Sequence, residues 1–261
     1  MLERHIAVEF KFTNHNFTKS PNMKLLNLFG EEFEVSHPHR KNGETATQRY
    51  RARIDKAIGK NIWRCVSLTN RKGAPVIEPY SYSVPKHFIR FDKRKGVSDP
   101  SSTMLHFYMY DCDFSSVLRN PESYIDELKQ YHSVVFPDAS QYMDMPSYRR
   151  MYNNALNKEI GQLWQKAGVR VVVNATWSDS ESYNYCFEGL PKGCMIAINS
   201  IGIKGNPYSI HLWRKGYAKA MECLDPSHII RYGDKIPGEN TTISTYFEVE
   251  HLYRMHNGRK R

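Results

Sequence analysis

The apolar pattern of residues 134–177 constrains the fold of this chain more than any other feature. Val134, Val135 and Phe136 form one short apolar run, and residues 169–173 form another that is rich in valine. Continuous β-branched runs are typical of parallel strands that are covered on both faces. Between these runs, apolar side chains recur at three- and four-residue steps, which predicts an amphipathic helix whose buried stripe comprises Met151, Tyr152, Ala155, Leu156, Ile160, Leu163 and Trp164. The segment therefore predicts a β-α-β unit.

The same alternation of short apolar runs and helical patterns extends on both sides of this unit. Further strands are predicted near residues 104–110, 194–203 and 229–233, and further helices over residues 121–131, 179–187 and 208–224. Strands that alternate with helices indicate an α/β domain with a mostly parallel sheet. Two arrangements fit, an incomplete barrel-like sheet and an open doubly wound sheet. Five strands are too few for a closed eight-stranded barrel, unless the N-terminal third contributes more.

The positive charge of the chain is concentrated in one block. The net charge is +10, yet residues 37–96 alone hold 15 Lys and Arg against 4 Asp and Glu. The best linker follows directly, at residues 96–102. We therefore predict a basic N-terminal region over residues 1–96, an α/β core domain over residues 104–250, and a basic tail over residues 251–261.

A charge this localised points to a polyanionic partner such as DNA or RNA. Aromatic side chains alternate with the cations near residues 80–95, and such a pattern suits single-stranded nucleic acid, because bases stack on the aromatics. The alternatives are a well-solvated basic surface and an ordinary strand whose aromatics face the core. The predicted nucleic-acid-binding residues are Arg49, Arg51, Arg53, Lys56, Lys60, Lys86, Arg90, Lys93, Arg94 and Lys95.

Polar side chains follow the predicted strands, where a parallel sheet would collect them at one edge. They are Asp111, Asp113, Asp138, Ser140, Asn174, Trp177, Asp179, Asn199, Ser200 and Tyr232. We predict Asp111, Asp138 and Asn174 as catalytic residues, with Asp111 and Asp138 as ligands of Mg²⁺ or Mn²⁺ in phosphoryl transfer. Two alternatives stay open: these Asp side chains cap the following helices, or Arg149 or Arg150 supplies the positive charge that Asp138 needs.

Several classes of function lack their sequence signatures. The chain has no GxxxxGK[ST] loop, no GxGxxG motif, no HExxH motif and no cluster of three cysteines. Its apolar runs are shorter than the ~20 residues that span a bilayer, and residues 1–12 lack the apolar core of a signal peptide. Five scattered cysteines favour reduced thiols. We therefore expect a cytoplasmic protein without a membrane partner.

Several longer motifs resemble those of a known family. HFYMYDCDF, FPDASQYMDMP, WQKAGVRVVVNATW and CFEGLPKG occur in this order between residues 106 and 193. Together they resemble an uncharacterised family of domains of unknown function that is common in bacteriophages and mobile elements. The resemblance covers residues 104–233, and it implies an α/β core in a phage or mobile-element setting without an assigned reaction. Two hypotheses follow: a nucleic-acid-binding protein, or a metal-dependent, nuclease-like enzyme of phosphoryl transfer.

Overall fold

The computed structural model describes residues 22–26, 32–36, 69–70, 73–80 and 83–249. The chain divides into two compact units, Met1–Ala57 and Ile58–Arg261. The described part of the first unit is a two-stranded antiparallel sheet of β1 (Asn22–Leu26) and β2 (Glu32–Ser36). The second unit contains the large sheet.

Seven strands of the second unit form one parallel sheet, in which spatial order follows chain order. The strands are β3 (His87–Arg90), β4 (Thr103–His106), β5 (Ser133–Val135), β6 (Val171–Asn174), β7 (Met195–Asn199), β8 (His228–Tyr232) and β9 (Ser244–Phe247). A doubly wound sheet reverses direction at a switch point, and this order does not. The predicted α/β fold is therefore confirmed in its barrel-like form.

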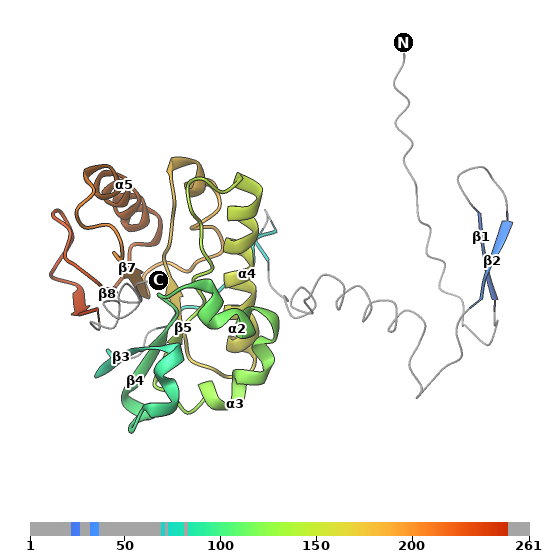
Figure 1. The fold of residues 1–261 in the computed structure, drawn as a ribbon, viewed down its shortest axis with the longest axis horizontal. Coiled ribbons are helices and arrows are strands. Elements are labelled where there is room, and N and C mark those ends of the chain that lie inside the picture. The colour runs from blue at the N-terminus through green and yellow to red at the C-terminus, as the bar shows by residue number, and fades with distance from the viewer. Residues whose placement is uncertain (1–21, 27–31, 37–68, 71–72, 81–82, 250–261) are drawn as a thin grey trace, which may run out of the picture. The chain divides into compact units, whose positions relative to one another are not determined.

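Helices and short 3-10 segments connect the strands and lie around the outside of the sheet (Figure 1). The α-helices are α2 (Ser115–Arg119), α3 (Ile125–Leu128), α4 (Ser147–Lys166) and α5 (Pro207–Leu224). The 3-10 segments are η2 (Phe91–Gly96), η3 (Pro100–Ser102), η4 (Asp111–Phe114), η5 (Pro121–Tyr124) and η6 (Ser180–Asn184). In this part of the chain, no helix combines the length and the apolarity that crossing a membrane would take.

Alternate side chains of each strand enter two separate apolar clusters. Val135 and Val172 belong to the inner cluster, whereas Val134 and Val171 belong to the outer one, beneath the helices. Both clusters are almost completely buried, which explains why the strands read as continuous apolar runs in the sequence. The sheet thus has a packed interior and a packed exterior.

Aromatic side chains nearly close the barrel between its two edge strands. Phe88 on β3 and Phe247 on β9 pack with their ring centroids 5.3 Å apart. Inside the same end of the barrel, Tyr108 and Tyr232 stack at 5.8 Å, and His106 lies against Tyr232 at 4.3 Å. The sheet is therefore a barrel of seven described strands, with a seam between β3 and β9 that side chains fill.

The structure corrects several details of the predicted elements. The sheet gains β3 and β9 beyond the five predicted strands, and β3 comes from the N-terminal third. The helices predicted over residues 121–131 and 179–187 are shorter segments, η5 with α3 and η6. The proposed boundaries of the extension, core and tail stay a prediction, although β3 lies within residues 1–96.

The predicted buried stripe of α4 is wrong at its first turns. Met151 and Tyr152 are exposed, while Arg150 and Asn154 are buried. The reason is polar: the start of α4 faces the loops at the end of the barrel, where Arg150 and Asn153 bind polar groups of those loops. The apolar stripe begins only at Leu156.

A buried ion pair fixes the segment that follows β8. Arg231 donates to both carboxylate oxygens of Glu239 at 2.8 Å, and their side chains are 0% and 1% exposed. Arg231 also donates to the carbonyl oxygen of Ile198, and its guanidinium lies 4.9 Å from the ring centroid of Trp213. Removing one member of such a pair leaves an uncompensated buried charge.

We expect Glu239→Gln to lower the free energy of unfolding by about 3 kcal/mol, measured by urea titration. Lys204→Gln is the matched control, because Lys204 and Asp234 form an exposed pair. Its effect should stay below ~1 kcal/mol. Equal effects of the two substitutions would contradict the importance of the buried pair.

Candidate functional site at the carboxyl end of the barrel

Asp138 lies at the centre of a polar network at the carboxyl ends of three strands. Its carboxylate accepts hydrogen bonds from the side-chain amides of Asn174, at 2.9 Å, and Asn199, at 3.3 Å. The Thr176 side chain also hydrogen-bonds to this carboxylate. Asp138 follows β5, whereas Asn174 ends β6 and Asn199 ends β7. Adjacent parallel strands therefore bring together residues that are far apart in sequence.

Neighbouring groups fix the orientation of both amides. The Asn174 nitrogen also donates to the Pro137 carbonyl, while its oxygen accepts from the Tyr108 hydroxyl at 3.2 Å. The Asn199 oxygen accepts from the backbone N–H of Ile201. Because a carbonyl only accepts and a backbone N–H only donates, both amides must point their NH₂ groups at Asp138.

The surroundings of Asp138 raise the pKa of its carboxyl group toward neutral pH. Burial, together with the negative charge of Asp111, raises the pKa of Asp138 to about 6, against the hydrogen bonds from Asn174, Thr176 and Asn199 that lower it. The residue nevertheless keeps part of its surface exposed. A carboxyl group with a pKa near 6 holds both protonation states near neutrality, as a general acid or base requires.

The loop after β5 is held in place by α4 and by Asp111. The Asn157 oxygen accepts from the Ala139 N–H at 3.0 Å, and the Asn153 nitrogen donates to the Ser140 carbonyl at 2.6 Å. Ser140 in turn donates its N–H and its hydroxyl to Asp111. These contacts hold Asp138 in a defined position, since they fix the backbone that follows it.

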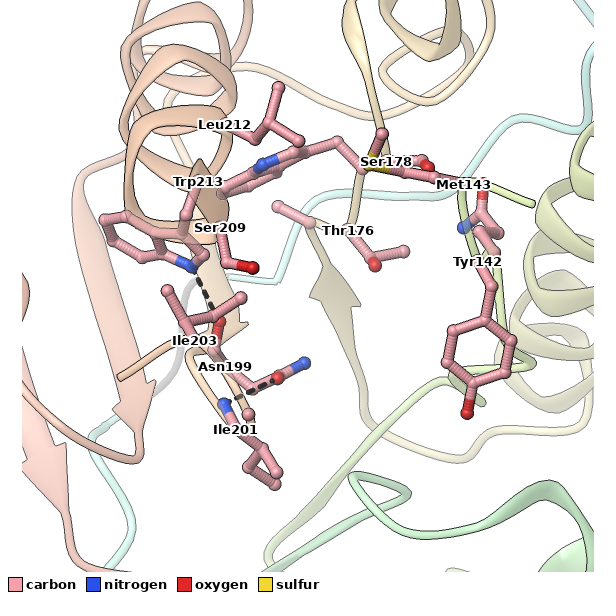
Figure 2. Close-up of a pocket in the computed structure, with 14 residues that line it drawn as sticks. Tyr142, Met143, Thr176, Ser178, Asn199, Ile201, Ile203, Ser209, Leu212 and Trp213 are labelled. Atoms are coloured by element: carbon pink, nitrogen blue, oxygen red, sulfur yellow. Dashed lines mark hydrogen bonds between the residues drawn. The ribbon is translucent and has the colours of Figure 1, made fainter. Parts of the chain in front are cut away.

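Two adjoining cavities open beside Asp138, with volumes of about 390 and 250 Å³. Asp138 lines the smaller cavity, and Trp213 lines the larger one. Figure 2 shows Trp213 and Tyr142 on opposite sides of the larger cavity, with Thr176 and Asn199 between them. The cavities share walls formed by Gln141, Tyr142, Thr176, Trp177, Asn199 and Ile201. Their size suits a small molecule.

Two tryptophans form rigid walls of this site. Trp177 packs against α5 at Gly216, where a Cβ atom would come within 2.0 Å of the indole nitrogen. Trp213 donates its indole N–H to the Asn199 carbonyl at 2.9 Å (Figure 2). The two rings lie 5.8 Å apart. A residue larger than glycine at position 216 would therefore displace one of these walls.

The structure brings three predicted site residues together and gives the others different tasks. Asp138, Asn174 and Asn199 form the network, with Asp111 one contact away through Ser140. By contrast, Asp179 caps η6, as the capping alternative predicted. Asp113 lies 4.0 Å from Arg90, Ser200 donates to the Asp234 carbonyl, and Tyr232 stacks inside the barrel.

The arginine alternative for Asp138 is wrong. Arg150 pairs instead with Asp179 at 2.7 Å and with Glu181 at 3.0 Å. Arg149 is exposed and lies over the ring of Tyr152. Hydrogen bonds from neutral groups, rather than a nearby cation, satisfy Asp138, and its pKa is accordingly raised rather than lowered.

The predicted Mg²⁺ or Mn²⁺ site would have few carboxylate ligands, and both already accept hydrogen bonds. Across the described residues, no three His, Cys, Asp or Glu side chains group as a metal site would require. Asp111 already accepts from the N–H and the hydroxyl of Ser140. Both oxygens of Asp138 accept from amides. The metal at Asp111 and Asp138 stays a prediction.

The predicted nucleic-acid-binding residues divide between the two parts of the chain. Arg49, Arg51, Arg53, Lys56 and Lys60 lie outside the described residues. Of the others, Arg90 pairs with Asp92 at 2.9 Å, and Arg94 binds Glu127 at 3.0 Å and covers the ring of Phe91. Lys86, Lys93 and Lys95 are exposed.

Three residues of the site are not among those that the sequence predicts, namely Tyr108, Gln141 and Trp213. Trp213 lies within the predicted helix over residues 208–224, where its ring stacks on Tyr217 as a core residue would. The apolar pattern predicts a strand that includes Tyr108, whereas β4 ends at His106. For Gln141 the sequence does offer a signal, because this polar residue lies within the FPDASQYMDMP motif.

Residues 71–249 match the model of a family described as a domain of unknown function, DUF4417. The chain belongs to this family. The whole seven-stranded sheet and the Asp138 network lie inside the matched region. The predicted resemblance to a phage family of unknown function is therefore confirmed.

Two curated relatives in this comparison come from bacteriophages. The gene 1 protein of Mycobacterium phage L5 is 28% identical over 153 residues, which cover 59% of this chain and 64% of that protein. The gene 1 protein of Mycobacterium phage D29 is 27% identical over 161 residues, covering 61% and 59%. This chain thus spans less than two thirds of each relative's length. No solved structure matches the chain.

The raised pKa of Asp138 predicts a pH-dependent loss of stability. Because the folded-state pKa of about 6 exceeds the unfolded value of 3.8, its contribution is complete below pH 4 and is lost as pH rises through 6. Between pH 4 and pH 7, we expect the free energy of unfolding of Asp138→Asn to rise by ~3 kcal/mol relative to that of the wild type, measured by urea titration.

Asp99→Asn is a control with the opposite sign. The hydroxyls of Ser101 and Ser102 lower the pKa of Asp99, so its contribution is present above the unfolded value and is lost as pH falls. If Asp138→Asn and the wild type keep a constant difference across this pH range, the buried carboxyl does not titrate as described.

Proposed function

We propose that this phage-family protein is an enzyme that transfers protons on a small uncharged or basic group, with Asp138 as general acid or base. The observation that carries the proposal is a carboxyl with a pKa of about 6 at the wall of a cavity. Its position supports the proposal further, because barrel enzymes place their chemistry at the carboxyl ends of the strands.

The composition of the cavity walls favours this proposal over phosphoryl transfer. None of the described residues lining either cavity is Lys or Arg, and Asp138 supplies the negative charge there. A phosphate group would meet a carboxylate and no cation, which is unfavourable in a partly desolvated site. An uncharged or basic group meets no such repulsion.

The experiment has two parts that use the full chain. Carboxyl ¹³C NMR should give Asp138 a pKa near 6, identified by the signal that Asp138→Asn removes. A mass-spectrometric survey of neutral and basic metabolites should then find a conversion that Asp138→Asn lowers by 10²-fold or more. A pKa below 4, or a conversion that survives in the variant, would overturn the proposal.

Nucleic-acid binding by residues 37–96 is a second candidate, favoured by the concentration of 15 cations against 4 acids. On duplex DNA, each phosphate contact contributes about 0.9 to the slope of log affinity against log salt concentration. We expect Lys86, Lys93 and Lys95→Gln together to reduce that slope by about 2 to 3, in filter-binding or anisotropy measurements.

A triple variant outside the block serves as the charge-matched control. Lys192, Arg214 and Lys215 are exposed and remove the same charge when changed to Gln. This control should keep the wild-type slope. If both variants lose the same amount of slope, the effect comes from net charge and not from contacts of these residues. Binding that does not depend on salt would exclude phosphate contacts.

A further inference from the structure

We propose that the joined cavities beside Asp138 bind an amino-bearing nucleobase, with its ring against Trp177 and an N–H directed at the Asp138 carboxyl. This inference rests on the proposed function, because it names the substrate class of the same site. Four features of the site support it: its shape, the remaining hydrogen-bonding capacity of Asp138, an unsatisfied amide, and a row of exposed tyrosines.

The shape and surface of the cavities suit a planar, uncharged ring. Their volumes of about 390 and 250 Å³ have room for a base and its sugar. Trp177 lines both cavities, and its contact with Gly216 fixes the position of the indole. Aromatic faces bind nucleobases by stacking, because every base presents a π-face.

Asp138 retains capacity for a donor from the ligand. An ionised carboxylate offers about four acceptor positions, and Asn174, Asn199 and Thr176 occupy three. The amino groups of adenine, cytosine and guanine are donors of this kind. Thymine lacks an amino group, and its single donor, N3–H, lies between two carbonyl oxygens that would come close to the acid.

Gln141 is a second group that could bind the ligand by hydrogen bonds, and unlike Asp138 its side chain has no hydrogen-bond partner. It lines both cavities, and neither its side-chain oxygen nor its nitrogen has a hydrogen-bond partner, although both atoms are buried. Leaving these groups unpaired costs free energy. A base edge carries a donor next to an acceptor, which is the complement of an amide.

Exposed tyrosines continue from the cavity along the same stretch of chain. Tyr142 lines the cavities and is 57% exposed, and Tyr148 and Tyr152 on α4 are 72% and 47% exposed. The latter two are four residues apart on one helix face, with Arg149 over the ring of Tyr152. Exposed aromatic rings of this kind suit the neighbouring bases of a single strand, which stack on them. The base therefore comes either from a free nucleoside or from single-stranded nucleic acid.

Calorimetry on the full chain at pH 7 distinguishes these sources. Adenosine, cytidine and guanosine should include at least one ligand that binds roughly tenfold more tightly than thymidine, as one good base contact allows. If single strands are the source, deoxyoligonucleotides of that base should bind more tightly than the nucleoside. Tyr148→Ser with Tyr152→Ser should then weaken the oligonucleotide alone.

Gln141→Leu separates a binding role from a structural one. The substitution removes an unsatisfied buried amide, so the free protein should become more stable while nucleoside affinity falls about fivefold or more. Gln130→Leu, at an exposed position on another segment, should leave affinity unchanged. A purely structural Gln141 would change stability and leave affinity intact.

The outcomes distinguish this inference from the proposed function. Absence of binding by all three amino-bearing nucleosides and their oligonucleotides overturns the inference, and so does thymidine binding as tightly as they do. If Asp138 nevertheless titrates near pH 6 and a different metabolite is converted, the proposed acid–base function stands. Nucleoside binding that is lost in Gln141→Leu and kept in Gln130→Leu supports the inference.

Discussion

The arrangement of the site depends on one constraint, namely that every strand of the main sheet runs in the same direction and follows chain order. Each connection must return outside the sheet, so the carboxyl ends of successive strands collect at one end of the barrel. Asp138, Asn174 and Asn199 meet there because each follows or ends one of three consecutive strands, β5, β6 and β7. One reversed strand would carry its polar residue to the opposite end.

Polar contacts at that end are maintained by groups on the outer side of the sheet. Asn199 is held through its carbonyl by Trp213, and Trp213 lies against Arg231, which is neutralised by Glu239. On the other side, Asn153 and Asn157 of α4 hold the loop that carries Asp138. The buried charge and the two helices thus position a network that they do not themselves enter.

The sequence was informative about the fold because burial on both faces leaves a local record. The valine runs at residues 134–135 and 171–173 predict parallel strands, and the spacing of apolar residues between them predicts α4. Polar residues after those runs predict which side chains lie at the carboxyl end of the barrel. Neither edge strand has a continuous apolar run, because β3 lies among cations and β9 is only half-buried. The sequence therefore offers β3 only as an alternative to a nucleic-acid-binding segment, and it does not predict β9.

The hydrogen-bond partners of each polar residue at the carboxyl end of the barrel depend on tertiary contacts, and local sequence patterns do not encode these. An aspartate before a helix reads the same whether it caps that helix, as Asp179 does, or accepts two amides, as Asp138 does. Arg150 is close to Asp138 in sequence, yet the side chain pairs with residues 29 and 31 positions further on. Exposed Met151 and Tyr152 likewise fit a buried stripe by spacing alone.

The seam between β3 and β9 gives the barrel a property that a fully hydrogen-bonded ring lacks. The rings of Phe88 and Phe247 meet across this seam. All the remaining neighbouring strands of the described sheet are joined by backbone hydrogen bonds. Side-chain contacts tolerate small displacements that would break a ladder, so the circumference can change there at little cost. The Asp138 network spans β5 to β7, in the middle of the strand order and far from that seam. Widening of the seam would therefore be absorbed at the edges of the sheet while the spacing of the acid and its two amides stays constant.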